Sequence, residues 1–232
     1  MINEIKKKIH IVHNIYVKHK YFIKKKSYSM DGEDLFITDY FKNKKKGFYV
    51  DIGCYHPLEG SNTYLLFKKG WNGINADVNS LSIELFNRAR EKDHNVNLAV
   101  SNNKQKLKIY FRKKINMLNT INKKFANNSF KKGYSIDYIQ ARTLSSILKE
   151  SKLKNKKIDF LNIDIEGNEI NALKTLNFEI YRPKLICVEI HNFTSNRLKK
   201  VNFKDHSIYK FLKQKGYKHI WKNEFSFIFK DK

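Results

Sequence analysis

Cysteine is scarce in this sequence, which limits both its redox chemistry and its metal chemistry. The 232 residues contain two cysteines, Cys54 and Cys187, and neither has a cysteine or histidine at a spacing typical of zinc sites. Both lie in or beside segments that we predict to be buried strands, so we expect small buried side chains in a reducing compartment. No signal peptide precedes them, which predicts a cytoplasmic protein.

Long apolar runs are absent as well, and arginine is scarce. No hydrophobic stretch approaches the roughly 20 residues that a membrane span requires. The formal net charge is +25, but only six of the 47 basic residues are arginine. Proteins that bind phosphates and bases usually employ the arginine fork. We therefore attribute much of the charge to overall composition and do not expect a nucleic-acid partner.

The third absence is the Gly-x-Gly-x-x-Gly pattern that holds a pyrophosphate at a helix N-terminus. The segment Gly47-Phe-Tyr-Val-Asp-Ile-Gly53 predicts a buried strand that opens into a turn, but Cys54-Tyr-His-Pro-Leu-Glu-Gly60 follows it. This longer, acidic turn suits a diphosphate poorly. It is compatible with S-adenosylmethionine (SAM), which carries a sulfonium and an ammonium group and no phosphate. The pattern favours a methyltransferase over a dehydrogenase.

A second carboxylate ends the next predicted strand, Ile74-Asn-Ala-Asp77. The spacing from Asp51 to Asp77 fits one βαβ unit, and a carboxylate at this strand tip can accept hydrogen bonds from both ribose hydroxyls. We expect the cofactor to contact the ends of the first three strands and the loops that follow them. The residues predicted there are Asp51, Gly53, Tyr55, Asp77, Val78 and Ser101.

Strand-like and helix-like segments alternate, which predicts a mostly parallel sheet covered by helices on both faces. The predicted strands are 48–52, 73–77, 95–100, 158–164 and 185–190, and the predicted helices are 63–69, 80–91, 144–149, 166–176 and 203–215. Residues 105–111 alternate and predict an edge strand, whereas 112–138 show little periodicity and predict an irregular excursion. Residues 218–221 and 225–229 predict a terminal hairpin. The expected fold is α/β and Rossmann-like, with a mostly parallel seven-stranded sheet that ends in this antiparallel hairpin.

The chain is long enough for one such domain, which we place at residues 27–232. Residues 1–26 form an arm in which Ile5, Ile9, Val12 and Ile15 recur at helical spacing between lysines. This pattern predicts an amphipathic helix. The helix could pack on the core or on a partner, or it could associate peripherally with a membrane.

Polar side chains also follow the fourth and fifth predicted strands, at the edge where open α/β sheets bind ligands. Asp164 and Glu166 follow one strand, and Glu189 and His191 end the other. So many acidic groups in one crevice would repel each other unless bound cations compensate. Asp164 and Glu166 could instead cap the next helix, and His191 could be an ordinary loop histidine.

Methyl transfer to an alcohol requires an aligned acceptor oxygen and a group that removes its proton. His191 could be this base, because histidine titrates near working pH. Alternatively, Asp164, Glu189 and His191 could hold Mg²⁺ that acidifies the hydroxyl. We predict these three residues as catalytic and, in the second case, as metal ligands. Asp164 is also expected to contact the cofactor.

Five segments follow one another along the chain: Tyr28-Ser-Met-Asp-Gly-Glu-Asp34, Phe48-Tyr-Val-Asp-Ile-Gly53 with Ser61-Asn-Thr-Tyr64, Gly70-Trp-Asn-Gly73, Asp159-Phe-Leu-Asn-Ile-Asp-Ile-Glu-Gly167, and Arg182-Pro183 ahead of Glu189. In this combination and order they resemble the FkbM family of SAM-dependent methyltransferases. The resemblance extends over nearly the whole chain. It implies a class I methyltransferase fold and O-methylation of a sugar, polyketide or similar small molecule, with a glycan or glycan precursor as the favoured acceptor. It also implies that Glu33 and Asn62 lie at the cofactor. Many members have a second glycine in the first loop, where this chain has His56-Pro57.

Two other functions remain open. An RNA ribose 2′-O-methyltransferase would use the positive charge, whereas base methylation is disfavoured because Asp164-Ile-Glu-Gly167 differs from the Asn/Asp-Pro-Pro-Tyr-like loop that grips a planar base. A noncatalytic SAM-binding module is the third reading. The acidic and histidine groups after the fourth and fifth strands argue against it, since binding alone would not require them.

Overall fold

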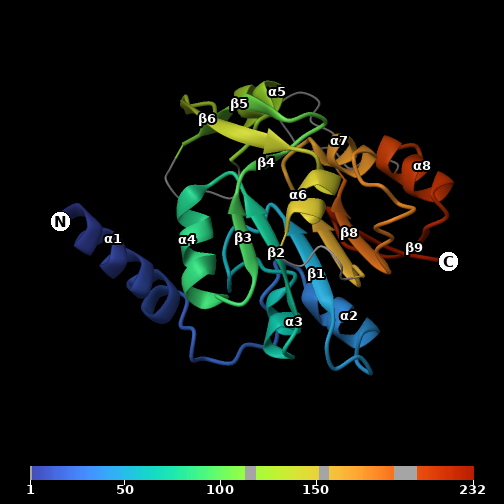
Figure 1. Ribbon diagram of the computed structural model, residues 1–232, viewed down its shortest axis with the longest axis horizontal. Coiled ribbons are helices and arrows are strands. Elements are labelled where there is room, and N and C mark those ends of the chain that lie inside the picture. Colours follow the sequence, from blue (N-terminus) through green and yellow to red (C-terminus); the bar gives the residue numbers. More distant parts are fainter. Residues whose placement is uncertain (1, 113–118, 152–156, 191–202) are drawn as a thin grey trace.

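A seven-stranded sheet forms the centre of the computed structural model, which describes residues 2–112, 119–151, 157–190 and 203–232 (Figure 1). Its strand order is β3-β2-β1-β7-β8-β10-β9. The parallel strands are β3 (His94–Asn97), β2 (Asn72–Asp77), β1 (Phe48–Ile52), β7 (Phe160–Ile163) and β8 (Leu185–Glu189). The strand β10 (Ser226–Lys230) runs antiparallel to both β8 and β9 (Lys218–Lys222). The predicted sheet and its terminal hairpin are therefore confirmed.

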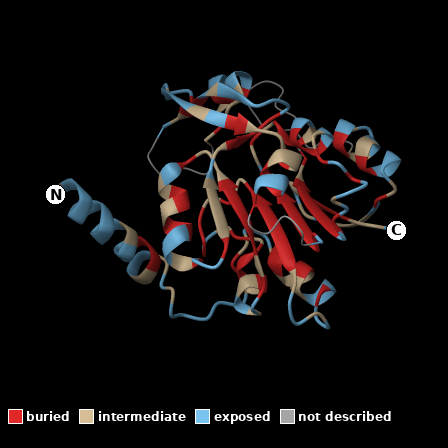
Figure 2. Ribbon diagram, viewed as in Figure 1, coloured by how far each residue is buried: buried red, intermediate tan, exposed pale blue. Residues whose placement is uncertain are grey.

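Helices cover both faces of this sheet, because successive strand residues point to opposite sides. Val50 and Ile52 belong to the cluster that includes α6 (Leu144–Glu150), α7 (Glu169–Lys174) and α8 (Ser207–Gln214). Tyr49 packs on the other side with α2 (Glu33–Tyr40) and α3 (Tyr64–Lys68). All five residues of β1 are buried, and Figure 2 shows the central strands as the buried core. Such burial on both faces explains why β1 is an almost continuous apolar run in the sequence.

The predicted strand 95–100 is wrong in one respect, because it divides between two sheets. After β3 ends, β4 (Ala99–Val100) enters a second sheet with the order β4-β6-β5. The predicted strand β5 (Gln105–Phe111) is present, but it pairs with β6 (Ser135–Arg142) in this second sheet. The chain therefore changes sheets at Leu98.

The irregular excursion predicted for residues 112–138 is also wrong where the structure describes it. It contains the helix α5 (Lys123–Ser129), capped by the Asn122 side chain, and the first half of β6. Most residues of β6 are exposed. A strand with so much water-facing surface does not need the apolar run or regular alternation by which sequence analysis finds strands.

The helix predicted to begin at Glu166 begins at Glu169 instead. Glu166 and Gly167 have φ angles of 57° and 91°, in the left-handed region that a right-handed helix does not tolerate. The chain thus makes a tight turn between β7 and α7. Asp164 and Glu166 lie in this turn, and neither belongs to the first turn of the helix.

The predicted N-terminal helix is present as α1 (Ile2–Val12), which continues into the short π-helix η1 (His13–Lys18). Its N-terminal end projects from the body of the molecule (Figure 1). Ile15 is fully buried and packs with Tyr28, Leu58 and Leu85. No helix among the described residues has the length and apolarity that a membrane crossing would need.

Candidate active site

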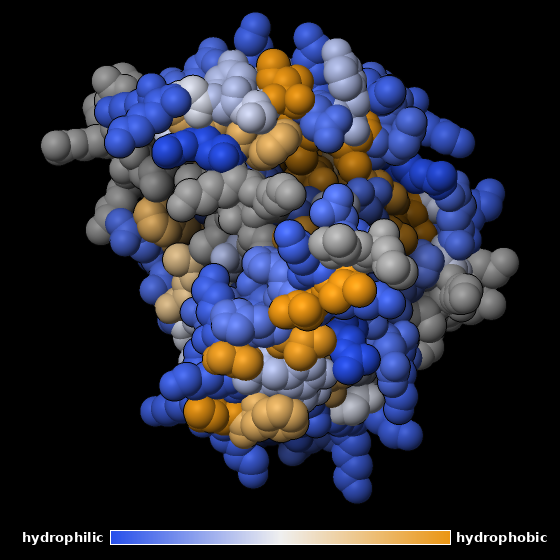
Figure 3. Space-filling model, turned by 90° about the vertical axis from the view of Figure 1, so that its left-hand side faces the viewer, coloured by the Kyte–Doolittle hydropathy of each residue, from blue (hydrophilic) through white to orange (hydrophobic). Residues whose placement is uncertain are grey.

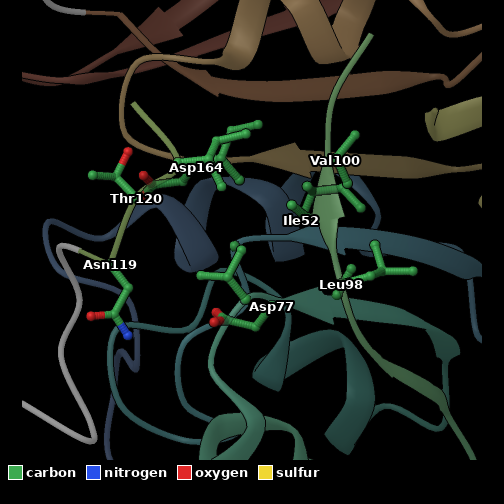
Figure 4. Close-up of a pocket in the computed structure, with 13 residues that line it drawn as sticks. Ile52, Asp77, Leu98, Val100, Asn119, Thr120 and Asp164 are labelled. Atoms are coloured by element: carbon green, nitrogen blue, oxygen red, sulfur yellow. The ribbon is translucent and has the colours of Figure 1, made fainter. Parts of the chain in front are cut away.

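A cleft opens at the carboxyl ends of the strands, beside the point where the chain order reverses between β1 and β7. Open α/β sheets bind ligands at such switch points. The cleft encloses about 470 Å³ of space, open solvent included, and Figure 4 shows its lining residues. They are Ile52, Gly53, Ala76, Asp77, Val78, Leu98, Ala99, Val100, Asn119, Thr120, Ile121, Asp164 and Ile165.

Gly53 is required because two loops touch at this position. Its φ is +81°, and a Cβ added there would lie 1.7 Å from the backbone oxygen of Asp164. Any side chain would therefore push the loop after β1 away from the loop after β7. Gly53 lines the cleft, as its prediction as a cofactor residue requires.

Asp77 projects into the cleft from the end of β2 (Figure 4). Its Oδ2 accepts a hydrogen bond from the Tyr55 backbone N–H at 2.8 Å, and its Oδ1 accepts one from the Asn79 N–H at 2.7 Å. Burial raises the pKa of Asp77 to about 6, although these two hydrogen bonds oppose the shift. Each oxygen keeps a second acceptor position, so the carboxylate can still receive two hydroxyls. Val78 beside it also lines the cleft.

Asp51 and Asn62 lie outside the cleft lining. Asp51 is buried and accepts hydrogen bonds from Thr63 Oγ1 at 2.7 Å and from Asn162 Nδ2 at 2.9 Å. Asn62 donates in turn to Asn162 Oδ1 at 3.0 Å. Burial raises the pKa of Asp51, against the two hydrogen bonds that it accepts. Because Asp51 and Asn62 are hydrogen-bonded to other side chains of the protein, we interpret them as a support behind the first loop.

Arg90 is a residue of this support that the sequence analysis missed. It is fully buried just after α4 (Ser80–Ala89) and donates to Thr63 Oγ1 at 2.8 Å and to Ser61 Oγ at 2.9 Å. It also donates to the carbonyl of Pro57. One guanidinium thus fastens three points of the first loop. An arginine in a chain that otherwise favours lysine was the available signal, because only the planar fork reaches several acceptors at once.

His56 occupies the position where the first loop departs from the family pattern. Its Nδ1 accepts the backbone N–H groups of Leu58 and Glu59 at 3.1 and 3.0 Å. Its Nε2 donates to Asn14 Oδ1 at 2.9 Å. Burial lowers the pKa of His56 to about 2, so the ring is neutral at physiological pH. His56 therefore attaches the first loop to the N-terminal segment.

Three carboxyl groups gather at the ends of β7 and β8. One oxygen each from Asp164, Glu166 and Glu189 lies within 4.8 Å of the others. Asp164 is exposed in the cleft, Glu166 is buried and Glu189 is half-buried. The structure thus brings together two of the three residues predicted as catalytic and adds Glu166. His191 lies outside the described residues.

These carboxyl groups hold protons more strongly than ordinary ones. Burial first, and then neighbouring negative charges, raise the pKa values of Glu166 and Glu189 well above the usual range. Although Asp164 reaches the open cleft, the protein atoms around its carboxyl group withdraw it from water and raise its pKa, whereas a hydrogen bond from Glu189 opposes this shift. Carboxyls this close cannot all ionise at once. Glu189 therefore retains a proton and donates it to Asp164 in a hydrogen bond.

Glu169 was another omission of the sequence analysis. Its Oε1 accepts the backbone N–H groups of Ile165 and Gly167 at 3.1 and 2.9 Å, which stabilises the turn between them. Burial raises its pKa to about 7. Sequence analysis placed Glu169 inside a helix, where this contact could not be foreseen.

Glu33 and Ser101 lie apart from the cleft lining. Glu33 accepts hydrogen bonds from Asn223 Nδ2 at 2.6 Å and Ser226 Oγ at 2.9 Å, close to the end of β8. Burial alone would raise its pKa, but backbone and side-chain donors outweigh burial and lower it. Ser101 follows β4, and its backbone N–H donates to the Arg142 carbonyl at 2.9 Å.

Asn119, Thr120 and Ile121 form a wall of the cleft that the sequence analysis missed. Thr120 Oγ1 donates to the Glu166 carbonyl at 3.2 Å, and a bridge to Tyr110 connects the wall to β5. Figure 4 shows Asn119 across the cleft from Asp77. Its Oδ1 is buried and has no hydrogen-bond partner among the described residues. Nothing local in the sequence marks this wall, because its place in the cleft depends on the contact of Thr120 with Glu166, which lies 46 residues further along the chain.

The cleft suits SAM through its apolar walls, the Asp77 carboxylate and the acidic groups that favour a sulfonium cation. With the seven-stranded sheet, it defines the protein as a SAM-dependent methyltransferase. The family model described as Methyltransferase FkbM domain matches residues 51–219, and the chain belongs to this family.

The chain is similar to a TehB-like SAM-dependent methyltransferase from Corynebacterium glutamicum, with a TM-score of 0.46 and 9% sequence identity over 100% of both chains. No curated protein matches the sequence.

Proposed function

We propose that the protein transfers the methyl group of SAM to a hydroxyl group of a small molecule, with a sugar or glycan precursor as the acceptor. The observation that carries this proposal is the cluster of Asp164, Glu166 and Glu189 beside the cofactor cleft. Membership of the FkbM family supports methyl transfer. The cluster supports a hydroxyl acceptor, because an alcohol needs a base where an already nucleophilic sulfur or amine would need none.

Asp164 is the base in this proposal. It is the member of the cluster that is exposed in the cleft, and its raised pKa makes it a stronger base than an ordinary aspartate. Bound SAM supplies the electrophilic methyl group. With SAM bound, Asp164 would accept the hydroxyl proton as the acceptor oxygen bonds to the methyl carbon and the methyl–sulfur bond breaks, which leaves S-adenosylhomocysteine. The protonated Glu189 holds Asp164 in position through their hydrogen bond.

A polar acceptor is supported by the surroundings of the cluster. Asn223 and Ser226 lie at the end of β8, where Ser226 is paired with Glu189 in the sheet. Both side chains hydrogen-bond to the buried Glu33. Binding sites for sugars need such fixed donors and acceptors, since each acceptor hydroxyl must exchange water for protein.

Mg²⁺ held by Asp164, Glu166 and Glu189 is a second way to acidify the hydroxyl. Carboxylate oxygens are suitable ligands, and octahedral coordination at about 2.0–2.1 Å places opposite ligands about 4.2 Å apart. One oxygen from each of the three carboxyl groups lies within 4.8 Å of the others, which is the range that such a site requires.

Transfer of labelled methyl groups from SAM to a panel of free and nucleotide-linked hexoses tests the proposal. We expect Asp164→Asn to lower kcat by at least ~100-fold while SAM affinity, measured by calorimetry, changes only a few-fold. Glu179→Gln removes an exposed carboxylate elsewhere and should leave kcat unchanged. An unchanged rate in Asp164→Asn would refute the assignment of the base.

Chelation and salt separate the alternatives. Activity that survives EDTA favours the base, whereas activity lost to EDTA and restored by Mg²⁺ favours the metal. Methylation of RNA in place of the sugars, with an affinity that falls steeply as salt rises, would replace the acceptor proposed here.

A further inference from the structure

The N-terminal segment, residues 2–26, exposes an apolar stripe. Three of its residues recur at helical spacing on α1, and three more follow in η1 and the loop after it. They are Ile5, Ile9, Val12, Val17, Phe22 and Ile23, with exposed fractions of 52%, 63%, 44%, 58%, 79% and 52%. Figure 3 shows apolar side chains as a broken band on this side of the molecule, bordered by hydrophilic ones.

This stripe is not the face by which the segment docks on the domain. The docked face carries Lys7, which pairs with Glu84 on α4, and Ile11, which packs against the core. Residues three or four positions apart share one face of a helix, so these two residues lie roughly opposite Ile5 and Ile9. Ile5 and Ile9 therefore lie on a face of the helix that the domain does not cover.

The charge around the stripe is positive beyond the average of the chain. Residues 2–26 contain eight lysines and one acidic residue, Glu4, whereas the whole chain contains 47 lysines and arginines and 22 acidic residues. Lys6 and Lys8 lie beside the stripe on α1, and three lysines follow it at positions 24–26. The local excess therefore exceeds what composition explains.

We propose that this apolar stripe and its lysines bind the surface of an anionic membrane. The stripe would enter the boundary between headgroups and acyl chains, and the lysines would meet lipid phosphates. A protein partner fits less well, because lysine is depleted from the centres of protein interfaces. Nucleic acid fits less well too, because its phosphates have no use for an aliphatic stripe.

The attachment to the cleft gives this binding a consequence for the site. The hydrogen bond between Asn14 and His56 joins the N-terminal segment to the first loop, whose Tyr55 N–H binds Asp77. A membrane-bound helix would thus keep this side of the cofactor cleft close to the lipid. Because His56 is neutral at physiological pH, this attachment does not depend on pH there.

Vesicle flotation with the full chain tests the apolar stripe. We expect partition onto vesicles of phosphatidylcholine and phosphatidylglycerol, and little onto phosphatidylcholine alone. The double variant Ile5→Ser/Ile9→Ser should lower partition by at least ~10-fold. The matched control Ile136→Ser/Ile180→Ser removes two isoleucines that are 51% and 69% exposed elsewhere, and it should stay within about twofold of the unmodified protein.

Lysine variants and sedimentation complete the test. Lys6→Gln/Lys8→Gln should weaken binding to anionic vesicles, whereas Lys131→Gln/Lys132→Gln should not. Equal loss in variant and control would mean attraction by net charge alone and would overturn the proposal. Self-association that Ile5→Ser/Ile9→Ser abolishes, without vesicle binding, would also overturn it and assign the stripe to a second copy. Calorimetry with SAM checks that each variant is folded, so the outcome does not depend on the proposed acceptor.

Discussion

Asp77 and Asp164 face one cleft from the ends of different strands, but their surroundings differ. Asp77 accepts a backbone N–H on each oxygen and has no other carboxyl hydrogen-bonded to it among the described residues. Asp164 shares a hydrogen bond with Glu189, beside Glu166, and all three pKa values are raised. At one end of the cleft, Asp77 is thus a fixed hydrogen-bond acceptor. At the other end, three neighbouring carboxyl groups compete for protons.

The residues that hold the loops at the two ends of the cleft differ in the same way. Arg90 and the buried hydrogen bonds of Asp51 fix the loop on the cofactor side. On the other side, the turn after β7 is held by two backbone hydrogen bonds to Glu169 and one from Thr120. A methyltransferase can therefore combine a firmly held cofactor half with a half in which several carboxyl groups compete for protons along one sheet edge. The variants below test that contrast.

The largest effect is expected when the cation behind the rigid end is removed. Arg90→Met leaves the buried Asp51 and Asp93 without their nearest positive charge and breaks the bonds to Ser61 and Thr63. We expect a loss of about 3–5 kcal/mol in the free energy of unfolding, measured by denaturant titration.

Arg88→Met is the matched control, because it removes an exposed arginine two positions away. It should change stability by less than about 0.5 kcal/mol. If both variants lost the same small amount, Arg90 would not fix the first loop as described.

A smaller effect is expected when Asp77 loses its charge. Asp77→Asn should weaken SAM binding by roughly 10–100-fold, because hydrogen bonds to a charged acceptor are worth about 1.5–3 kcal/mol. Calorimetry measures this change, with the exposed Asp137→Asn as control. Equal affinity in Asp77→Asn and the unmodified protein would place the ribose elsewhere.

The Asp77→Asn variant should also change how the stability of the protein depends on pH. The folded pKa of Asp77 is about 6, above its value in the unfolded chain, so the folded state binds the proton more tightly. Its contribution to stability is complete below about pH 4 and is lost as the pH rises through 6. The unmodified protein without SAM should therefore lose more stability between pH 4 and pH 7 than Asp77→Asn does. Thermal unfolding across this range measures the difference, and parallel curves would contradict the raised pKa.

The smallest effect is expected at the wall contributed by the second sheet. Asn119→Ala removes a buried amide oxygen that has no partner among the described residues, so a ligand contact there is worth about 1 kcal/mol. SAM affinity should fall about fivefold, whereas the exposed Asn103→Ala should have no effect. A stronger effect on the acceptor KM than on SAM binding would instead assign Asn119 to the acceptor.

The same contrast explains which features the sequence predicted. The central strands, and the position of Asp77 at the end of one of them, could be predicted because each corresponds to a short, continuous segment with a buried apolar run. Asp51 was correctly placed at a buried strand end, but its partner Asn162 lies 111 residues away. Contacts of that range leave no local pattern.

Other features escaped for identifiable physical reasons. The left-handed turn at Glu166 was not predicted because glutamate rarely adopts that conformation. In the sequence, the segment from Glu166 onward therefore resembles the start of a helix. The division between β3 and β4 occurs at one residue, Leu98, inside an otherwise continuous strand pattern. His191, predicted as catalytic, lies outside the described residues, and its role stays a prediction.

The chain departs from the main fold at β4 to form the second sheet and returns to it at β6, and these two strands are neighbours. Ala99 pairs with Ala141, Val100 pairs with Arg142, and the Ser101 N–H binds the Arg142 carbonyl. The chain between these positions is a closed excursion whose ends are fixed side by side. Insertions or deletions within it would reshape the wall that carries Asn119 without shifting the register of the main sheet. One unit of the chain can therefore change while the strand ends that carry Asp77 and Asp164 stay as they are.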